Sequence, residues 1–145
     1  MSQEIWFLRP DLGLLNELGQ NTLKEHLGIV FTEVGPNYLR ATMPVDRRTV
    51  QYFGMLHGGA SVALAETVAS TAANFVINPQ THYALGLEIN ANHLRTLREG
   101  SVYAHAEPLH LGRQTQVWHI LIREVGTDAL VCVVRHTVIV RAKSE

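Results

Sequence analysis

The chain has 145 residues, of which 46% are hydrophobic, and a formal net charge of −1. This length suits one domain with a full hydrophobic core, and the apolar content excludes wholesale disorder. The balanced charge excludes the broad basic surface that recruits nucleic acid.

Two short helices are expected at the N-terminal end. Leucines recur at helical spacing through residues 11–27, and Gly19 interrupts the pattern. Asn21 or Thr22 is the expected cap of the second helix, with Glu25 in its first turn.

A β-hairpin is expected next, formed by residues 28–34 and 37–45. A Gly-Pro-Asn sequence at positions 35–37 joins the two segments and is a strong turn signal. Residues 46–54 are polar and end in glycine, which predicts a loop leading into the next element.

One long helix is predicted over residues 58–77. This run is rich in alanine, the best helix former, and Pro79 comes only after it. Its apolar residues cover nearly the whole circumference, which predicts burial on all sides. Glu66 lies in the middle of the run, and a buried carboxylate costs several kcal/mol unless it is paired, hydrogen-bonded or protonated. We therefore expect Glu66 to have a function.

Four extended segments follow the helix, at residues 82–95, 101–110, 114–125 and 129–141. Short glycine-containing turns separate them, so consecutive strands should be antiparallel and form a four-stranded meander. A single long apolar helix is buried only if the sheet curls around it. The predicted fold is α+β, a curled antiparallel sheet wrapped around one long central helix. We expect a single domain over residues 1–145, with an N-terminal helical extension at 1–27.

The start of the long helix is a candidate site. The first N–H groups of a helix have no internal partner, and the helix dipole makes this end electropositive. Gly58 and Gly59 would let a ligand carbonyl approach the bare backbone, as in an oxyanion hole. The alternative is that these glycines only allow a tight entry into a crowded helix. His57 before them and Glu66 within the helix favour the functional interpretation.

Glu66 and Ser70 lie one turn apart on the same helix face. Glu66 would act as a general base or nucleophile, or alternatively as a structural carboxylate satisfied by Ser70 and a neighbouring donor. His57 and Glu66 are nine positions apart, which is about 13 Å along a helix, so one chain cannot bring both to one reaction centre. Two helices packed antiparallel across a two-fold axis could do so, which predicts at least a dimer.

The strand after the helix and several arginines give weaker signals. Alternation places five side chains on one strand face: Leu85, Leu87, Ile89, Ala91 and His93. His93 would then line a pocket or be a satisfied core or edge histidine. Three arginines, Arg95, Arg98 and Arg113, fall at strand ends or turns, where they can meet phosphates, although such arginines are usually only solvated.

Other functions and compartments are disfavoured. Residues 59–63 are one residue short of a serine-hydrolase nucleophile elbow, so Ser61 is not expected to be a nucleophile. The histidines form no metal-binding motif, and we expect no metal or other cofactor. Cys132 lies in an apolar run and is expected to be a small buried hydrophobe. Neither a signal peptide nor a membrane span is recognised, so we expect a cytoplasmic protein.

At the level of motifs, the chain resembles the hotdog-fold thioesterases. The resemblance covers residues 28–141 and is carried by the strings MPVDRRTVQYFGMLHGGASVALAETVAS, GLEINANHLR, PLHLGR and QVW. It is greatest for the PaaI-like branch, which contains the bacterial 1,4-dihydroxy-2-naphthoyl-CoA thioesterases of menaquinone biosynthesis. The N-terminal segment lies outside the resemblance.

The resemblance implies a set of site residues. The catalytic acid would be Glu66, the oxyanion-binding N–H that of Gly58, and the hydroxyl that places water that of Ser70. Gln51 and His57 would complete the site with Gly58 from the partner subunit. Sheets would join edge to edge in a homodimer, and two dimers would form a homotetramer. Apart from the resemblance, strand-end position makes four residues candidate nucleotide or pantetheine contacts: Arg95, His110, Gly112 and Arg113. Strand alternation adds His93 as a candidate substrate contact.

The function expected from residues and resemblance together is hydrolysis of an aromatic or bulky acyl-CoA, with 1,4-dihydroxy-2-naphthoyl-CoA as one candidate. Glu66 would either activate a water or attack the thioester directly to give a mixed anhydride. Two alternatives stay open. One is a thioesterase acting on acyl carrier protein thioesters, and the other is a non-catalytic acyl-CoA-binding hotdog protein.

Overall fold

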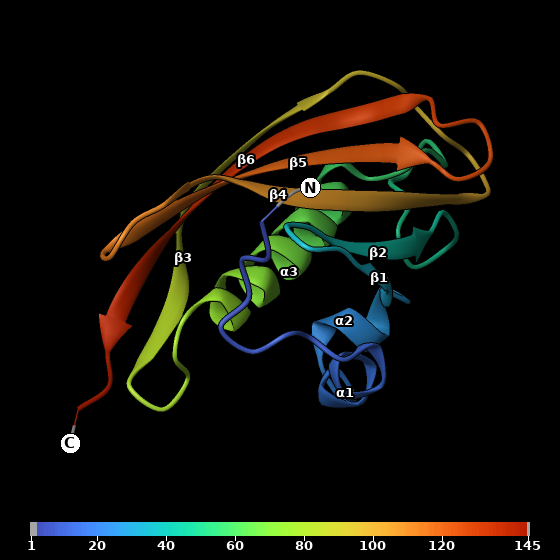
Figure 1. Ribbon diagram of the computed structural model, residues 1–145. Helices are drawn as coiled ribbons and strands as arrows, with labels where there is room; N and C mark the ends of the chain where they lie inside the picture. The colour runs from blue at the N-terminus through green and yellow to red at the C-terminus, as the bar shows by residue number, and fades with distance from the viewer. Residues whose placement is uncertain (1–2, 145) are drawn as a thin grey trace.

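A curved antiparallel sheet of six strands lies over one long helix in the computed structural model, which describes residues 3–144 (Figure 1). The elements in chain order are α1 (Leu12–Leu18), α2 (Leu23–His26), β1 (Val30–Val34), β2 (Leu39–Pro44), α3 (Gly58–Val76), β3 (His82–His93), β4 (Ser101–Leu111), β5 (Thr115–Glu124) and β6 (Leu130–Ala142). The predicted helix and strands are all present, with bounds within a few residues of those expected.

The strand order is β1-β2-β4-β5-β6-β3, so the expected four-stranded meander is wrong at β3. All neighbouring strands are antiparallel as predicted, and β4, β5 and β6 do form a meander. However, β2 pairs along one edge of β4 and β5 along the other. Because both edges of β4 are occupied, β3 lies at the far end of the sheet beside β6.

Helix α3 packs one face against the concave side of the sheet. Its buried residues recur three and four positions apart: Ala60, Ser61, Leu64, Ala65, Val68, Ala69, Ala72 and Ala73. The alanines on this face let the helix backbone come close to the strands. The expected burial on all sides is wrong for this chain, because the opposite face, which carries Glu66, is only partly covered.

The sheet supplies the large side chains of the core. Trp118, Ile120 and Ile122 alternate along β5 and are fully buried. Burying each such side chain contributes about 1.5–3 kcal/mol. The indole N–H of Trp118 donates to Gln116 Oε1 at 2.9 Å, so its polar atom is satisfied within the core. Cys132 is also buried, and burial raises its thiol pKa to about 11, which fits the expected packing role.

The two N-terminal helices lie beside β1, at one edge of the sheet (Figure 1). Asp11 caps α1 by accepting the Leu14 N–H at 2.9 Å. The Asn16 side chain bonds both backbone groups of Phe31, at 3.0 and 2.9 Å, and thereby covers part of this edge. Thr22 is the N-cap residue of α2 as predicted, but its hydroxyl donates to Gly19 O and makes no cap bond. No helix in residues 3–144 is long and apolar enough to cross a bilayer.

Candidate active site

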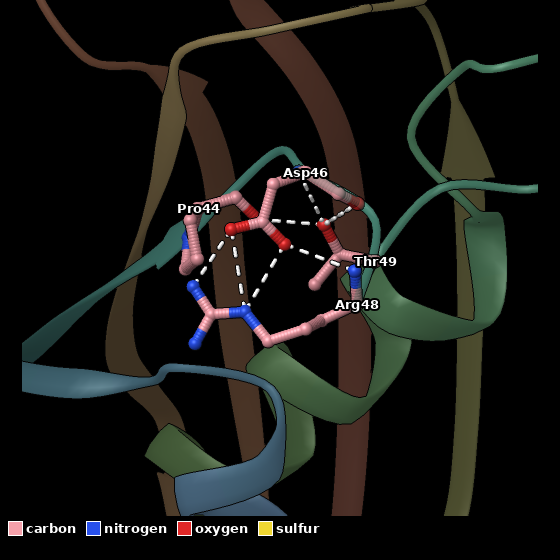
Figure 2. Close-up of polar contacts among 4 residues, drawn as sticks. All are labelled: Pro44, Asp46, Arg48 and Thr49. Carbon is pink, nitrogen blue, oxygen red and sulfur yellow. Dashed lines mark hydrogen bonds and ion pairs between the residues drawn. The ribbon is translucent and has the colours of Figure 1, made fainter.

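A polar turn after β2 sets the course of the loop that leads to α3 (Figure 2). The Arg48 guanidinium donates to the Asp46 carboxylate at 2.7 Å, and the Arg48 backbone N–H donates to it at 2.9 Å. These bonds lower the pKa of Asp46 to about 2. The Thr49 hydroxyl closes the turn by donating to Pro44 O at 2.7 Å.

This turn anchors the residue before the helix. The His57 N–H donates to Thr49 O at 2.8 Å, and Val50 forms a β-bridge with Leu56. The Leu56 N–H donates to Leu97 O at 2.7 Å, which ties the loop to the segment between β3 and β4. The entry into α3 is therefore held from two sides.

His57 is the N-cap of α3. Its backbone is extended, with φ −70° and ψ 129°, and its Nδ1 accepts the Gly59 N–H at 2.8 Å. The N–H groups of Ala60 and Ser61 donate to the His57 carbonyl. Within residues 3–144, the Gly58 N–H has no hydrogen-bond acceptor. It is therefore free to bind an external oxygen at the positive end of the helix.

Two further predicted residues lie near this helix start. A Cβ atom added at Gly58 would be 2.9 Å from His93 Nε2, so the ring of His93 covers the glycine. Gln51 lies in the turn before the helix, where its N–H donates to Met55 O at 2.8 Å. Its side-chain oxygen accepts the Phe53 N–H, and so the Gln51 side chain is engaged with its own loop.

Glu66 and Ser70 occupy the middle of α3, as predicted, but Glu66 is not buried. Its side chain is 44% exposed and accepts no hydrogen bond from residues 3–144. Its Oε1 lies 3.8 Å from Nε2 of His136, a side chain of β6 that is 1% exposed. The Ser70 hydroxyl lies 2.9 Å from the same Nε2. Burial is the main cause that lowers the pKa of His136, and it outweighs the opposing charge of Glu66.

His136 was not singled out from the sequence, where it was considered only among the histidines that could bind a metal. Alternation along β6 was the available signal, because Val134, His136 and Val138 share the buried face. This pattern places His136 on the sheet face that packs against the core.

A β-bulge in β3 makes room for the side chains of Glu66 and His136. The register with β6 shifts between Gly86 and Glu88, so Ile89 pairs with His136 whereas Leu85 pairs with Ile139. The expectation that Leu85 shares a face with His93 is therefore wrong, and Leu85 is 55% exposed. A Cβ atom at Gly86 would collide with the Glu66 carboxylate.

The turn between β4 and β5 brings three other predicted residues together. His110, Gly112 and Arg113 line a cavity of about 510 Å³. The Gly112 N–H donates to Thr115 O at 2.9 Å, and a Cβ atom at Gly112 would be 2.6 Å from His110 Nε2. The glycine is therefore needed for the histidine to fold over the turn.

The residues around the start of α3, which include His93, and those of the β4–β5 turn lie at opposite ends of the sheet. His93 pairs with Cys132 on β6, whereas the β4–β5 turn bonds to the Val140 N–H near the other end of that strand. The eight residue steps from Cys132 to Val140 along β6 correspond to about 26 Å. Arg95 lies at the His93 end, where its N–H donates to Val131 O at 3.3 Å.

Comparison with known proteins identifies the family. Residues 53–130 match the thioesterase superfamily. The chain is 49% identical to the proofreading thioesterase EntH of Cronobacter sakazakii over 118 residues, which cover 81% of this chain and 85% of that protein. It resembles the structure of a variant of thioesterase PA1618 of Pseudomonas aeruginosa with a TM-score of 0.94 and 44% identity, over 96% of this chain and 99% of that one.

A third relative agrees in sequence and in fold. The structure of thioesterase HI1161 of Haemophilus influenzae is similar with a TM-score of 0.93 and 47% identity, over 97% of both chains. The curled sheet over one helix is the arrangement that the motif resemblance implied. The chain therefore belongs to the thioesterase superfamily and has its hotdog fold.

Proposed function

We propose that this protein hydrolyses acyl-CoA thioesters with aromatic or bulky acyl groups, 1,4-dihydroxy-2-naphthoyl-CoA among them. The observation that carries the proposal is the pairing, on one helix, of a free Gly58 N–H with the half-exposed carboxylate of Glu66. Hydrolysis needs a donor for the developing oxyanion and a base or nucleophile for the carbonyl carbon. Thioesterase relatives, including EntH, support the same chemistry.

The reaction follows from these two groups. The thioester oxygen accepts a hydrogen bond from the Gly58 N–H, where the helix dipole favours negative charge. A water attacks the carbonyl carbon while Glu66 takes one of its protons, or Glu66 attacks first and water cleaves the resulting anhydride. In the first route the C–S bond then breaks and releases the acid and the coenzyme A thiolate. In the second route the C–S bond breaks as the anhydride forms, and water then releases the acid from Glu66. Because thiols ionise far more readily than alcohols, this leaving group needs no strong acid.

A homodimer completes the site in this proposal. Gly58 and Glu66 are eight positions apart, about 12 Å along α3, so one chain does not bring them to one carbonyl. Strand β3 is at the edge of the sheet and has a free side for a second copy. Antiparallel pairing of two β3 strands would place the start of one subunit's β3 beside the end of the other's, so opposite ends of the two sheets would lie next to each other. The partner's helix start would then approach Glu66 and the β4–β5 turn of this chain.

The remaining predicted residues would hold the substrate. Arg113 and His110 offer charge and donors to a nucleotide phosphate at the cavity of about 510 Å³, which Gly112 also lines. Arg95 and His93 do the same at the other sheet end. Beside His57 lies a hollow of about 300 Å³ that is lined in part by apolar side chains. These include Leu23 of α2 and Leu27, the residue that follows α2. It offers the acyl group an apolar wall.

Acyl carrier protein thioesters are the second candidate substrate class. The observation in favour is the 49% identity to EntH, whose name is proofreading thioesterase. The chemistry at Glu66 and Gly58 would be unchanged, and only the surface around the thioester would contact a protein instead of a nucleotide.

Thiol release tests the proposal directly. Benzoyl-, phenylacetyl-, naphthoyl- and medium-chain acyl-CoAs are compared with the same acyl groups on acyl carrier protein. We expect the aromatic acyl-CoAs to give the highest kcat/KM, and Glu66→Gln to lose at least about a hundredfold in kcat. Glu17→Gln, on the exposed side of α1, is the matched control and should keep wild-type rates. Equal rates for Glu66→Gln and wild type would refute the role of Glu66.

A further inference from the structure

His136 is a polar side chain in an apolar part of the core. It is 1% exposed, and its neighbours on the inner face of β6 are the buried Val134 and Val138. A hydrophobic residue of similar volume would fill this space without the desolvation cost of an imidazole. The contacts of the two ring nitrogens therefore have to account for a histidine at this position.

The two nitrogens have different partners, which defines the tautomer. Nδ1 lies 3.1 Å from the backbone oxygen of Glu88, and a carbonyl only accepts, so Nδ1 carries the proton. In the neutral ring Nε2 is then an acceptor. It lies 2.9 Å from the Ser70 hydroxyl, which must be the donor in that bond. The Glu66 carboxylate, 3.8 Å from Nε2, has no proton to share with it.

The direction of the Ser70 bond is unusual for a helix. A hydroxyl inside a helix commonly donates to the carbonyl four residues earlier, as Thr67 does to Ala63 O at 2.7 Å. Ser70 instead donates across to the sheet. With its proton committed to His136, the Ser70 oxygen can only accept from whatever lies beside Glu66.

The sheet is adapted to this arrangement at the same level. The bulge between Gly86 and Glu88 interrupts the ladder opposite Val138 and Thr137, next to His136, and the Glu88 carbonyl accepts a hydrogen bond from the imidazole. A Cβ atom at Gly86 would also be 3.0 Å from His136 Cε1. The bulge and the glycine therefore accommodate both the imidazole and the carboxylate.

We infer that His136 is a positioning residue that fixes Ser70 as a hydrogen-bond acceptor for the attacking water. The inference rests on the proposed thioesterase function. The water would donate one hydrogen to Glu66 and the other to Ser70 Oγ, which leaves its lone pair for the carbonyl carbon. His136 itself contacts neither substrate nor water.

A matched pair of amide substitutions separates the two nitrogens. An asparagine side chain reaches the place of Nδ1, and a glutamine reaches the place of Nε2. His136→Asn keeps the donor to Glu88 O and loses the acceptor for Ser70, whereas His136→Gln does the reverse. Each variant leaves one former partner of the imidazole without its hydrogen bond, the Ser70 hydroxyl in His136→Asn and the Glu88 carbonyl in His136→Gln, so the two should lose similar stability.

The expected result is a difference in kcat at equal KM. His136→Gln should stay within about threefold of wild type. His136→Asn should lose at least about tenfold, up to the roughly hundredfold that misplacing a reacting group by 1 Å costs. Equal kcat in the two variants, or kcat that only follows the unfolding temperature, would overturn the inference.

A double-mutant cycle with Ser70→Ala provides the second measurement. If His136 acts through Ser70, adding His136→Asn to Ser70→Ala should lower kcat no further. Additive losses would overturn the inference while leaving the thioesterase proposal intact. A wild-type protein that releases no thiol from any acyl thioester would instead refute the proposed function, and this inference with it.

Discussion

Gly86 of β3 faces the carboxylate of Glu66 on α3 so closely that no Cβ atom fits between them. The glycine sits at the bulge in β3, where the strand already departs from regular pairing with β6. Its absent side chain, and not a special backbone conformation, is what this contact requires. The close approach links the irregularity of the sheet to the group proposed to carry the reaction.

Substituting Gly86→Ala should therefore displace Glu66 more than it unfolds the protein. The carboxylate is the far end of a flexible side chain that is 44% exposed, so it can turn aside and the loss of stability should be small. We expect kcat to fall by roughly a hundredfold, since the carboxylate must move by about 1 Å or more. Gly13→Ala in α1, where the added Cβ would meet only Asp11 Oδ1 at 3.2 Å, is the control and should keep full activity. Wild-type kcat in Gly86→Ala would contradict the placement of Glu66.

Replacing Gly58 by proline tests the free N–H at the helix start. Proline is tolerated at the first helical position, and the extended backbone of His57 suits a residue that precedes proline. Gly58→Pro removes the donor, while Gly58→Ala adds a Cβ atom near His93 and keeps it. We expect Gly58→Pro to have a kcat about 10²–10³-fold below that of Gly58→Ala, measured by thiol release. Equal rates would exclude the backbone donor.

Two substitutions of His57 separate its cap from its chemistry. Because Nδ1 accepts the Gly59 N–H, the neutral ring carries its proton on Nε2, which can donate to a substrate. His57→Ala should lose about 1 kcal/mol of stability with the cap, whereas the asparagine oxygen in His57→Asn should replace it. Both variants should lower kcat/KM to a similar extent, as both lack Nε2–H. An asparagine variant with wild-type kcat/KM would make His57 a cap alone.

The helix and its polar residues were predictable because local rules decide them. An alanine run between Gly58 and Pro79 specifies α3, and spacing alone puts Glu66 and Ser70 on one face. The hairpins follow in the same way from glycine turns. The burial of Glu66 was wrong because hydrophobic residues around a helix do not reveal which face a sheet covers.

What could not be predicted depends on contacts between distant segments. The place of β3 depends on which strands pair with β4. Although β3 is nearer to β4 in sequence, β2 and β5 occupy the two edges of β4, and β3 pairs with β6. The bulge at Gly86 then reverses the face of Leu85; the glycine within the strand was a local signal for it, but it does not fix the register with β6. The bond from Ser70 to His136 requires the register of β6 beneath α3, which only the folded sheet provides.

The turn in Figure 2 predicts a pH-dependent contribution to stability. Arg48 lowers the pKa of Asp46 from 3.8 to about 2 in the folded protein, so between these values the unfolded chain binds more protons. The stabilisation by ionised Asp46 is therefore complete above pH 3.8 and is lost as the pH falls toward 2. Asp46→Asn should unfold more easily than wild type at pH 7, and the difference should vanish by about pH 2 in denaturant titrations.

Two inactive variants should restore activity when combined, if each site takes Glu66 from one subunit and Gly58 from the other. Co-expressed Glu66→Gln and Gly58→Pro chains form heterodimers in which one site has both groups intact and the other has neither. With random pairing, half of the dimers are mixed, so thiol release should reach about a quarter of the wild-type rate.

The control for this experiment pairs Glu66→Gln with a chain that carries both substitutions, which leaves every site without Glu66 and should give no recovery. If instead each chain held a complete site, the mixture would stay as inactive as its components. Differently tagged chains allow the heterodimer to be purified, and sedimentation then gives its mass, which also distinguishes a dimer from a tetramer. A heterodimer of the expected mass without activity would refute the shared site, because the 12 Å or so between Gly58 and Glu66 along α3 then has to be bridged within one chain.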